Sequence, residues 1–129
     1  MDLLRTGYYR EMHHAEESDP SIIDYVNKLS AQNELEHICN YLQSGIPLIV
    51  CCGVDTDIIN PNRGVSGCPS MLTDGHYIWP GDLAYYVKEY ALGIDENFIA
   101  NMRNNNWTIP IKLEDIDFDN LYLNGKKLV

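Results

Sequence analysis

The sequence predicts an α+β fold, a helix-dominated single domain with short β-hairpins that spans residues 1–129. Three observations support this prediction. Apolar residues recur at helical spacing in several segments. The dipeptides Asp74-Gly75 and Asn124-Gly125 each stand between strand-forming runs, which is typical of a two-residue hairpin turn. A chain of 129 residues is long enough for one hydrophobic core.

The first third of the chain predicts an arm followed by two helices. Residues 1–19 show no clear period, so we expect an irregular N-terminal arm. Asp19-Pro20 is typical of a helix start, and apolar residues at helical spacing then predict a helix over 20–30. A second apolar stripe predicts a helix over 33–44, with Gly45 as its left-handed cap.

The middle of the chain predicts a strand and then a long loop. Residues 46–52 are apolar and rich in strand formers. Residues 53–69 contain three glycines and two prolines, which predicts a loop. Loops of this length in small domains are usually either functional or mobile.

The second half predicts hairpins at both ends of a helical region. We expect a hairpin over 70–79, then a helix that starts at Pro80 and ends at Gly93. A further helix over 96–105 follows, capped by Asp95. A terminal hairpin is predicted over 120–129.

The charge balance restricts the class of partner. The chain has 19 acidic against 9 basic residues, a net charge of −10. This charge disfavours nucleic acid and anionic membranes, and it favours a basic protein partner. No apolar run reaches the roughly 20 residues of a membrane-spanning helix, and the N-terminus does not resemble a secretory signal. We therefore expect a cytoplasmic protein.

The cysteines and histidines form no recognised catalytic or metal-binding pattern. The four cysteines (Cys39, Cys51, Cys52, Cys68) are expected to be free buried thiols, and neither they nor the histidines show a metal-ligand spacing, so no metal or cofactor is predicted. Cys68, His76 and Asp74 are close in sequence and leave open a small cysteine- and histidine-dependent enzyme as an alternative.

The segment 114–119 carries four acids in six residues, interleaved with apolar residues. In an extended segment Asp115, Asp117 and Asp119 would share one side, where their carboxylates repel one another. A cationic partner surface would relieve this repulsion, and a solvated surface is the alternative. The predicted partner-contact residues are Glu114, Asp115, Asp117 and Asp119 here, Asp55 and Asp57 in the long loop, Tyr85 on the expected helix, and Glu16 and Glu17 in the arm.

Several short segments carry a resemblance to a known family. They are Gly7-Tyr8-Tyr9-Arg10-Glu11-Met12, Leu42-Gln43-Ser44-Gly45, Asp57-Ile58-Ile59-Asn60-Pro61, Leu72-Thr73-Asp74-Gly75, Tyr77-Ile78-Trp79-Pro80, Asp82-Leu83-Ala84-Tyr85-Tyr86-Val87 and Trp107-Thr108-Ile109-Pro110. With these segments the chain resembles the bacterial immunity proteins of contact-dependent growth inhibition and related polymorphic toxin systems.

The resemblance implies a binding function and no enzyme activity. A protein of this kind binds one cognate toxin domain inside the producing cell and neutralises it. Many such toxins are nucleases, RNases or DNases, with basic substrate-binding surfaces that an acidic inhibitor can occlude. A regulatory domain that binds another basic protein is the remaining alternative.

Overall fold

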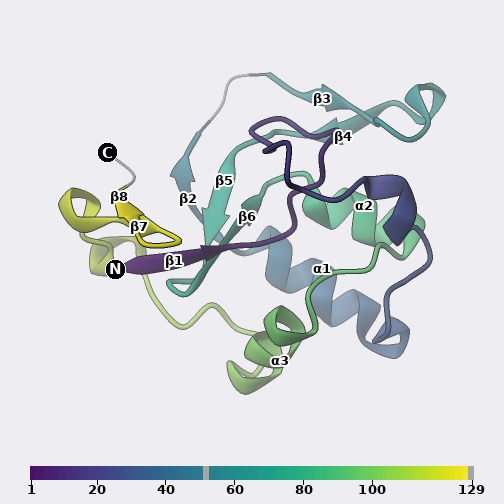
Figure 1. The fold of residues 1–129 in the computed structure, drawn as a ribbon. Helices are drawn as coiled ribbons and strands as arrows, with labels where there is room; N and C mark the ends of the chain where they lie inside the picture. The colour runs from purple at the N-terminus through teal and green to yellow at the C-terminus, as the bar shows by residue number, and fades with distance from the viewer. Residues whose placement is uncertain (51–52, 128–129) are drawn as a thin grey trace.

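The computed structural model describes residues 1–50 and 53–127, and in this part of the chain the fold is built on a six-stranded mixed sheet (Figure 1). The strand order is β2-β5-β6-β1-β7-β8. The strands are β1 (Asp2–Arg5), β2 (Ile46–Ile49), β5 (Met71–Thr73), β6 (Tyr77–Pro80), β7 (Tyr122–Leu123) and β8 (Lys126–Lys127). Strand β1 runs parallel to both of its neighbours, and the other pairs are antiparallel.

The expectation of a helix-dominated α+β fold is wrong, because the molecule is a mixed α/β fold organised around this sheet. The strands have two to four residues each, too few for an alternating pattern to be recognised. The irregular arm predicted for 1–19 is also wrong at Asp2–Arg5. These residues form β1, where Leu4 lies opposite Tyr77 and Asp2 opposite Tyr122.

Helices cover one face of the sheet (Figure 1). They are α1 (Leu35–Gln43), α2 (Leu83–Tyr90) and α3 (Glu96–Asn104). Their apolar sides meet Trp79 of β6 in one core, where Tyr86 and Phe98 are fully buried. The predictions near 33–44 and 96–105 are confirmed, and Asp95 caps α3 by accepting a hydrogen bond from the Asn97 amide.

The structure corrects four of the predictions about helices and their ends. The helix expected over 20–30 is only a 3₁₀ turn, η1 (Ile22–Tyr25), because Val26 is extended and Asn27 has a positive φ. Pro80 ends β6 rather than starting a helix, and α2 ends at Ala91 in the left-handed conformation, before Gly93. Gly45 is not left-handed but packs so closely on Trp79 that no side chain would fit.

The C-terminal part of the chain covers the other face of the sheet. Leu3 and Ile78 are buried there against Ile116 and Leu121. The acidic segment is not extended as predicted. It folds into two 3₁₀ turns, η4 (Leu113–Asp115) and η5 (Phe118–Asn120), because Ile116 must turn inward to the core while the polar residues on both sides stay in water. The hairpins at Asp74-Gly75 and Asn124-Gly125 are confirmed over the described residues.

The long loop predicted over 53–69 contains a small ribbon of two strands, which stands apart from the main sheet (Figure 1). Strand β3 (Asp55–Thr56) pairs with β4 (Val65–Gly67), and the turn η3 (Pro61–Arg63) lies between them. We call these residues, from 54 to 67, the β3–β4 ribbon. Among the described residues no helix has both the length and the apolar character needed to cross a membrane.

Candidate functional site beside the β3–β4 ribbon

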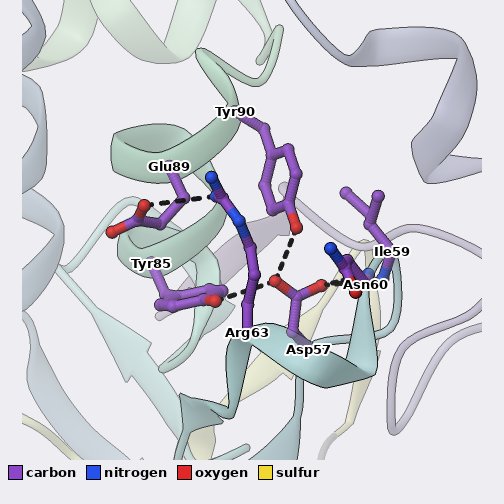
Figure 2. A network of polar contacts seen from close by, with 7 residues as sticks. All are labelled: Asp57, Ile59, Asn60, Arg63, Tyr85, Glu89 and Tyr90. Atoms are coloured by element: carbon purple, nitrogen blue, oxygen red, sulfur yellow. Dashed lines mark hydrogen bonds and ion pairs between the residues drawn. The ribbon is translucent and has the colours of Figure 1, made fainter.

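Asp57 fastens the ribbon to helix α2 (Figure 2). It follows β3 directly and is fully buried. Its Oδ2 atom accepts hydrogen bonds from the hydroxyls of Tyr85, at 2.8 Å, and Tyr90, at 2.6 Å. Both tyrosines lie on α2, so the carboxylate joins the end of β3 to one side of this helix.

The second oxygen of Asp57 holds the loop that follows β3. Its Oδ1 atom accepts from the backbone amides of Ile59, at 2.8 Å, and Asn60, at 2.9 Å. Burial alone would raise the pKa of Asp57, but the hydrogen bonds from Tyr90, the Asn60 amide, Tyr85 and the Ile59 amide outweigh it, and the pKa lies below its ordinary value. The charged form of Asp57 is therefore a fully satisfied structural group.

Arg63 closes the same network from outside. Its guanidinium carbon lies 4.9 Å from the centre of the Tyr90 ring, and its Nη1 atom is 3.3 Å from Glu89 (Figure 2). Both side chains of this ion pair are partly exposed, so the pair adds little stability by itself. The ion pair matters for position, because it holds η3 against the last turn of α2.

A pocket of about 220 Å³ lies where the ribbon meets the N-terminal arm and the start of α2. Three acids, Glu11, Asp55 and Asp82, line this pocket, which we call the acidic pocket. Apolar walls come from Met12 and Ile58. Among the described residues that line it there is no lysine or arginine, and the basic group is the imidazole of His13.

Asp82 is the most deeply buried acid of the pocket, with 4% of its surface exposed. It precedes the first residue of α2, where an aspartate normally accepts a backbone amide, but its side chain makes no capping hydrogen bond. Among the described residues, its carboxylate accepts from the Ser66 hydroxyl, at 3.3 Å, and from its own backbone amide. Burial first, and then the charge of Asp55, raises the pKa of Asp82 to about 6.

His13 and Asp55 form the outer part of the pocket. The His13 Nδ1 atom lies 2.5 Å from Asp55 Oδ2, and most of the imidazole is in water. The hydrogen bond to Asp55 and the charge of this carboxylate raise the pKa of His13. The charge of His13 also lowers the pKa of Asp82, but the hydrogen bond of the imidazole is with Asp55 and not with Asp82.

The structure places the contact residues predicted in the long loop, on α2 and in the arm in different environments. Asp55 lies in the acidic pocket. Asp57 is buried and cannot serve as a surface contact, because the bend after β3 turns it toward α2. Tyr85, expected to be exposed, is half-buried, and burial followed by its hydrogen bond to Asp57 raises its pKa to about 12. Glu16 and Glu17 are exposed in the arm.

The acids of segment 114–119 do not form a row of free carboxylates. Asp115 accepts the Lys112 amide at 2.9 Å, and Asp117 accepts the Asp119 amide at 3.1 Å. Hydrogen bonds from the Asn120 side chain and the Asp119 amide lower the pKa of Asp117. Glu114 and Asp119 are exposed. These acids shape the two turns, so their charge density does not itself require a partner.

The sequence neighbours Cys68, His76 and Asp74 are not assembled into a catalytic group. The Cys68 carbonyl lies against Gly81, at the open end of the β5–β6 hairpin, whereas His76 belongs to the turn at its other end. Asp74 is buried and accepts the Tyr41 hydroxyl and the Asn101 amide group, besides backbone amides of its own turn. Its role is to hold the turn.

The cysteine predictions are only partly confirmed. Cys39 is buried as expected, whereas Cys68 is exposed because it lies on the loop after β4. Cys51 and Cys52 lie outside the described residues. Among the described residues no group of three or more His, Cys, Asp or Glu side chains could hold a metal ion.

Sequence reasoning missed Asp82, Glu11 and His13 as members of one site. The local signal at Asp82 is an acid at a helix start, which indicates a cap and not a pocket. Glu11 and His13 lie about 70 residues before Asp82, and only the tertiary fold brings them together.

A scan against protein-family models, a search of curated proteins and a search of solved structures each find no match to this chain. What the site can do is therefore argued from its own geometry. A pocket with three acids, one histidine and apolar walls is suited to a positively charged group on an apolar stem.

Proposed function

We propose that this protein is an immunity-type inhibitor that binds a basic toxin domain and blocks it. The observation that carries the proposal is the acidic pocket, which is lined by Glu11, Asp55 and Asp82, with one histidine as the basic group among the described residues that line it. A basic protein surface supplies the charge that this pocket lacks.

The charge of the whole chain supports the same class of partner. The net charge of −10 accelerates encounter with a cationic protein and repels phosphate backbones and anionic membranes. Part of the positive charge is already neutralised by acids of the same chain. Ion pairs join Arg5 to Asp19, Arg63 to Glu89 and Arg103 to Glu34.

The resemblance to immunity proteins supports a toxin as the partner, and the fold explains what the resembling residues do. Asp74 holds the β5–β6 turn, Trp79 is fully buried, and Trp79 Nε1 donates to the Leu42 carbonyl at 3.1 Å. These residues build the core. This part of the resemblance therefore indicates a shared scaffold. Other resembling segments contribute Glu11 and Asp82 to the acidic pocket, which is where we place the contact with the toxin.

The proposal is tested by finding whether a secreted toxin gene lies beside the gene of this chain and by co-expressing its toxin domain with this protein. We expect the two proteins to co-purify, and cells that produce the toxin domain to regain growth. Association should slow steeply as salt is added, because screening shortens the reach of surface charges. Failure to restore growth, with both proteins folded and expressed, would contradict the proposal.

A regulatory domain for another basic protein would use the same pocket. The growth assay distinguishes the two functions, because such a domain would bind a basic partner without protecting cells from the toxin.

A further inference from the structure

We propose that the acidic pocket receives one arginine or lysine side chain of the partner, which pairs with Asp82 while the outer face of the β3–β4 ribbon packs around it. The inference rests on the proposed function for the partner's identity. The chemistry of the recognised group rests on the pocket alone. To the proposed function, the inference adds where the partner makes contact and which type of partner side chain enters the pocket.

Asp82 has few hydrogen-bond donors for a carboxylate that is almost fully buried. A buried carboxylate is costly unless donors surround it. Asp57, eight residues before the start of β4, receives four hydrogen bonds from the described residues, whereas Asp82 receives one from its own backbone amide and a long one from Ser66. A guanidinium or ammonium group in the pocket would supply both the missing donors and the opposite charge.

The acidic pocket has the size and the lining of a site for one side chain. Sites for drug-sized ligands have volumes of roughly 300–1,000 Å³. A pocket of about 220 Å³ is smaller than these, and it fits a single side chain. Met12 and Ile58 provide apolar walls for the methylene stem, and Asp82 lies where the charged end would arrive.

The β3–β4 ribbon exposes apolar side chains beside the pocket. Val54 and Val65 are each 58% exposed, and Val65 pairs with Thr56 across the ribbon. Ser66 is buried and points the other way, toward Asp82. Exposed valines next to a charged pocket are typical of an interface, in which apolar contact contributes affinity and charge sets the choice of partner.

Charge decides the occupant of this surface. A second copy of this chain would bring another net charge of −10 to a pocket that is already acidic, so self-association is opposed. A basic protein loop with an apolar residue next to its arginine or lysine satisfies both parts of the surface.

The test uses N-acetyl-arginine methylamide as a probe in an NMR titration of the full chain. N-acetyl-citrulline methylamide, which has nearly the same shape and no charge, is the control ligand. We expect the arginine probe to shift the amides of His13, Asp55 and Asp82, and the citrulline probe to leave them in place. Equal shifts with both probes, or shifts confined to 114–119, would overturn the proposal.

Two variants sharpen this titration. Asp82→Asn should abolish the shifts, and Asp117→Asn, which changes an exposed acid of the C-terminal turns, should retain them. Unchanged shifts in Asp82→Asn would contradict the role of this carboxylate. A circular dichroism melt confirms that both variants are folded.

The partner experiment separates this inference from the proposed function. If wild type restores growth and Asp82→Asn binds the toxin domain about a hundredfold more weakly, both stand. If Asp82→Asn binds as well as wild type, the inference fails while the inhibitor function stands. If the arginine probe binds but wild type does not protect cells, the inhibitor function fails and the pocket's specificity stands.

Discussion

Two buried carboxylates near the β3–β4 ribbon differ in how many donors surround them. Asp57 accepts four hydrogen bonds from the described residues, two from tyrosines of α2 and two from the backbone. Asp82 is almost as buried, but its donors among the described residues are its own backbone amide and, at 3.3 Å, the Ser66 hydroxyl. Burial alone does not tell a structural acid from a binding acid, and the number of donors distinguishes the two.

The same difference gives the two acids opposite effects on stability. The pKa of Asp57 is lowered in the folded state, so its contribution is present above the unfolded pKa and is lost as the pH falls through the folded value. The pKa of Asp82 is raised, so its contribution is present below the unfolded pKa of 3.8 and is lost as the pH rises through about 6. At neutral pH the first acid stabilises the fold and the second destabilises it.

The largest expected effect comes from removing the satisfied acid. Asp57→Ala leaves two backbone amides and two tyrosine hydroxyls without their acceptor. We expect the free energy of unfolding to fall by about 3 kcal/mol, as measured by urea denaturation at neutral pH. A loss below about 0.5 kcal/mol, the size of an ordinary surface substitution, would contradict the structural role of Asp57.

Asp82→Asn should act in the opposite direction. The amide keeps the shape of the side chain and removes a charge that is costly to bury. We expect the free energy of unfolding at pH 7.5 to rise by about 2 kcal/mol. This is less than the roughly 3 kcal/mol that corresponds to a pKa raised from 3.8 to about 6, because the amide of asparagine also costs free energy to bury. Destabilisation by this substitution would show that the charge is well satisfied in the free protein.

The pH dependence of this difference sharpens the comparison. Below about pH 3 Asp82 is protonated in both states, so wild type and Asp82→Asn should unfold with nearly the same free energy. Between the unfolded pKa of 3.8 and the folded pKa of about 6 the advantage of the variant should grow, and at higher pH it should level off. A difference that is constant with pH would mean that titration of Asp82 is not its source.

Tyr85→Phe removes one of the donors to Asp57 and should have a smaller effect. The hydroxyl of Tyr90 and two backbone amides remain, so the carboxylate keeps most of its hydrogen bonds. We expect a loss of about 1 kcal/mol in urea denaturation. A loss equal to that of Asp57→Ala would indicate that Tyr85 alone holds the ribbon.

The smallest effect is expected at the C-terminal acids. Asp117 is exposed and its partners lie within its own turn. Asp117→Asn should change the free energy of unfolding by less than about 0.5 kcal/mol, and toxin binding should be retained. A large loss of toxin binding would instead indicate that segment 114–119 is the contact surface, as the sequence analysis predicts.

Local signals in the sequence were sufficient for some of the fold. The apolar stripe of α1, the Asp95 cap of α3 and the Asp74-Gly75 turn each depend on residues close in sequence, and each prediction is confirmed. The sheet could not be predicted in this way. Strand β1 has four residues and pairs with strands more than 70 positions away, so nothing nearby in the sequence indicates it.

The candidate site depends even more on tertiary structure. Asp82 precedes a helix, a position that indicates capping, and only its burial and its missing capping bond reveal a different role. Asp57 shows the reverse, because an acid in a polar loop indicates exposure, yet two tyrosines of α2 enclose it. The sequence shows the excess of acidic residues, but it does not show which of these acids are buried in the folded protein.

The most direct test of this contrast is an NMR titration of the side-chain carboxyl carbons of Asp57 and Asp82 in the free protein. We predict a pKa near 6 for Asp82 and a pKa below 3.8 for Asp57. Addition of N-acetyl-arginine methylamide should lower the pKa of Asp82 and leave that of Asp57 unchanged. A pKa at or below 3.8 for Asp82 in the free protein would contradict the account, because this carboxylate would then already have the partners that the acidic pocket is proposed to lack.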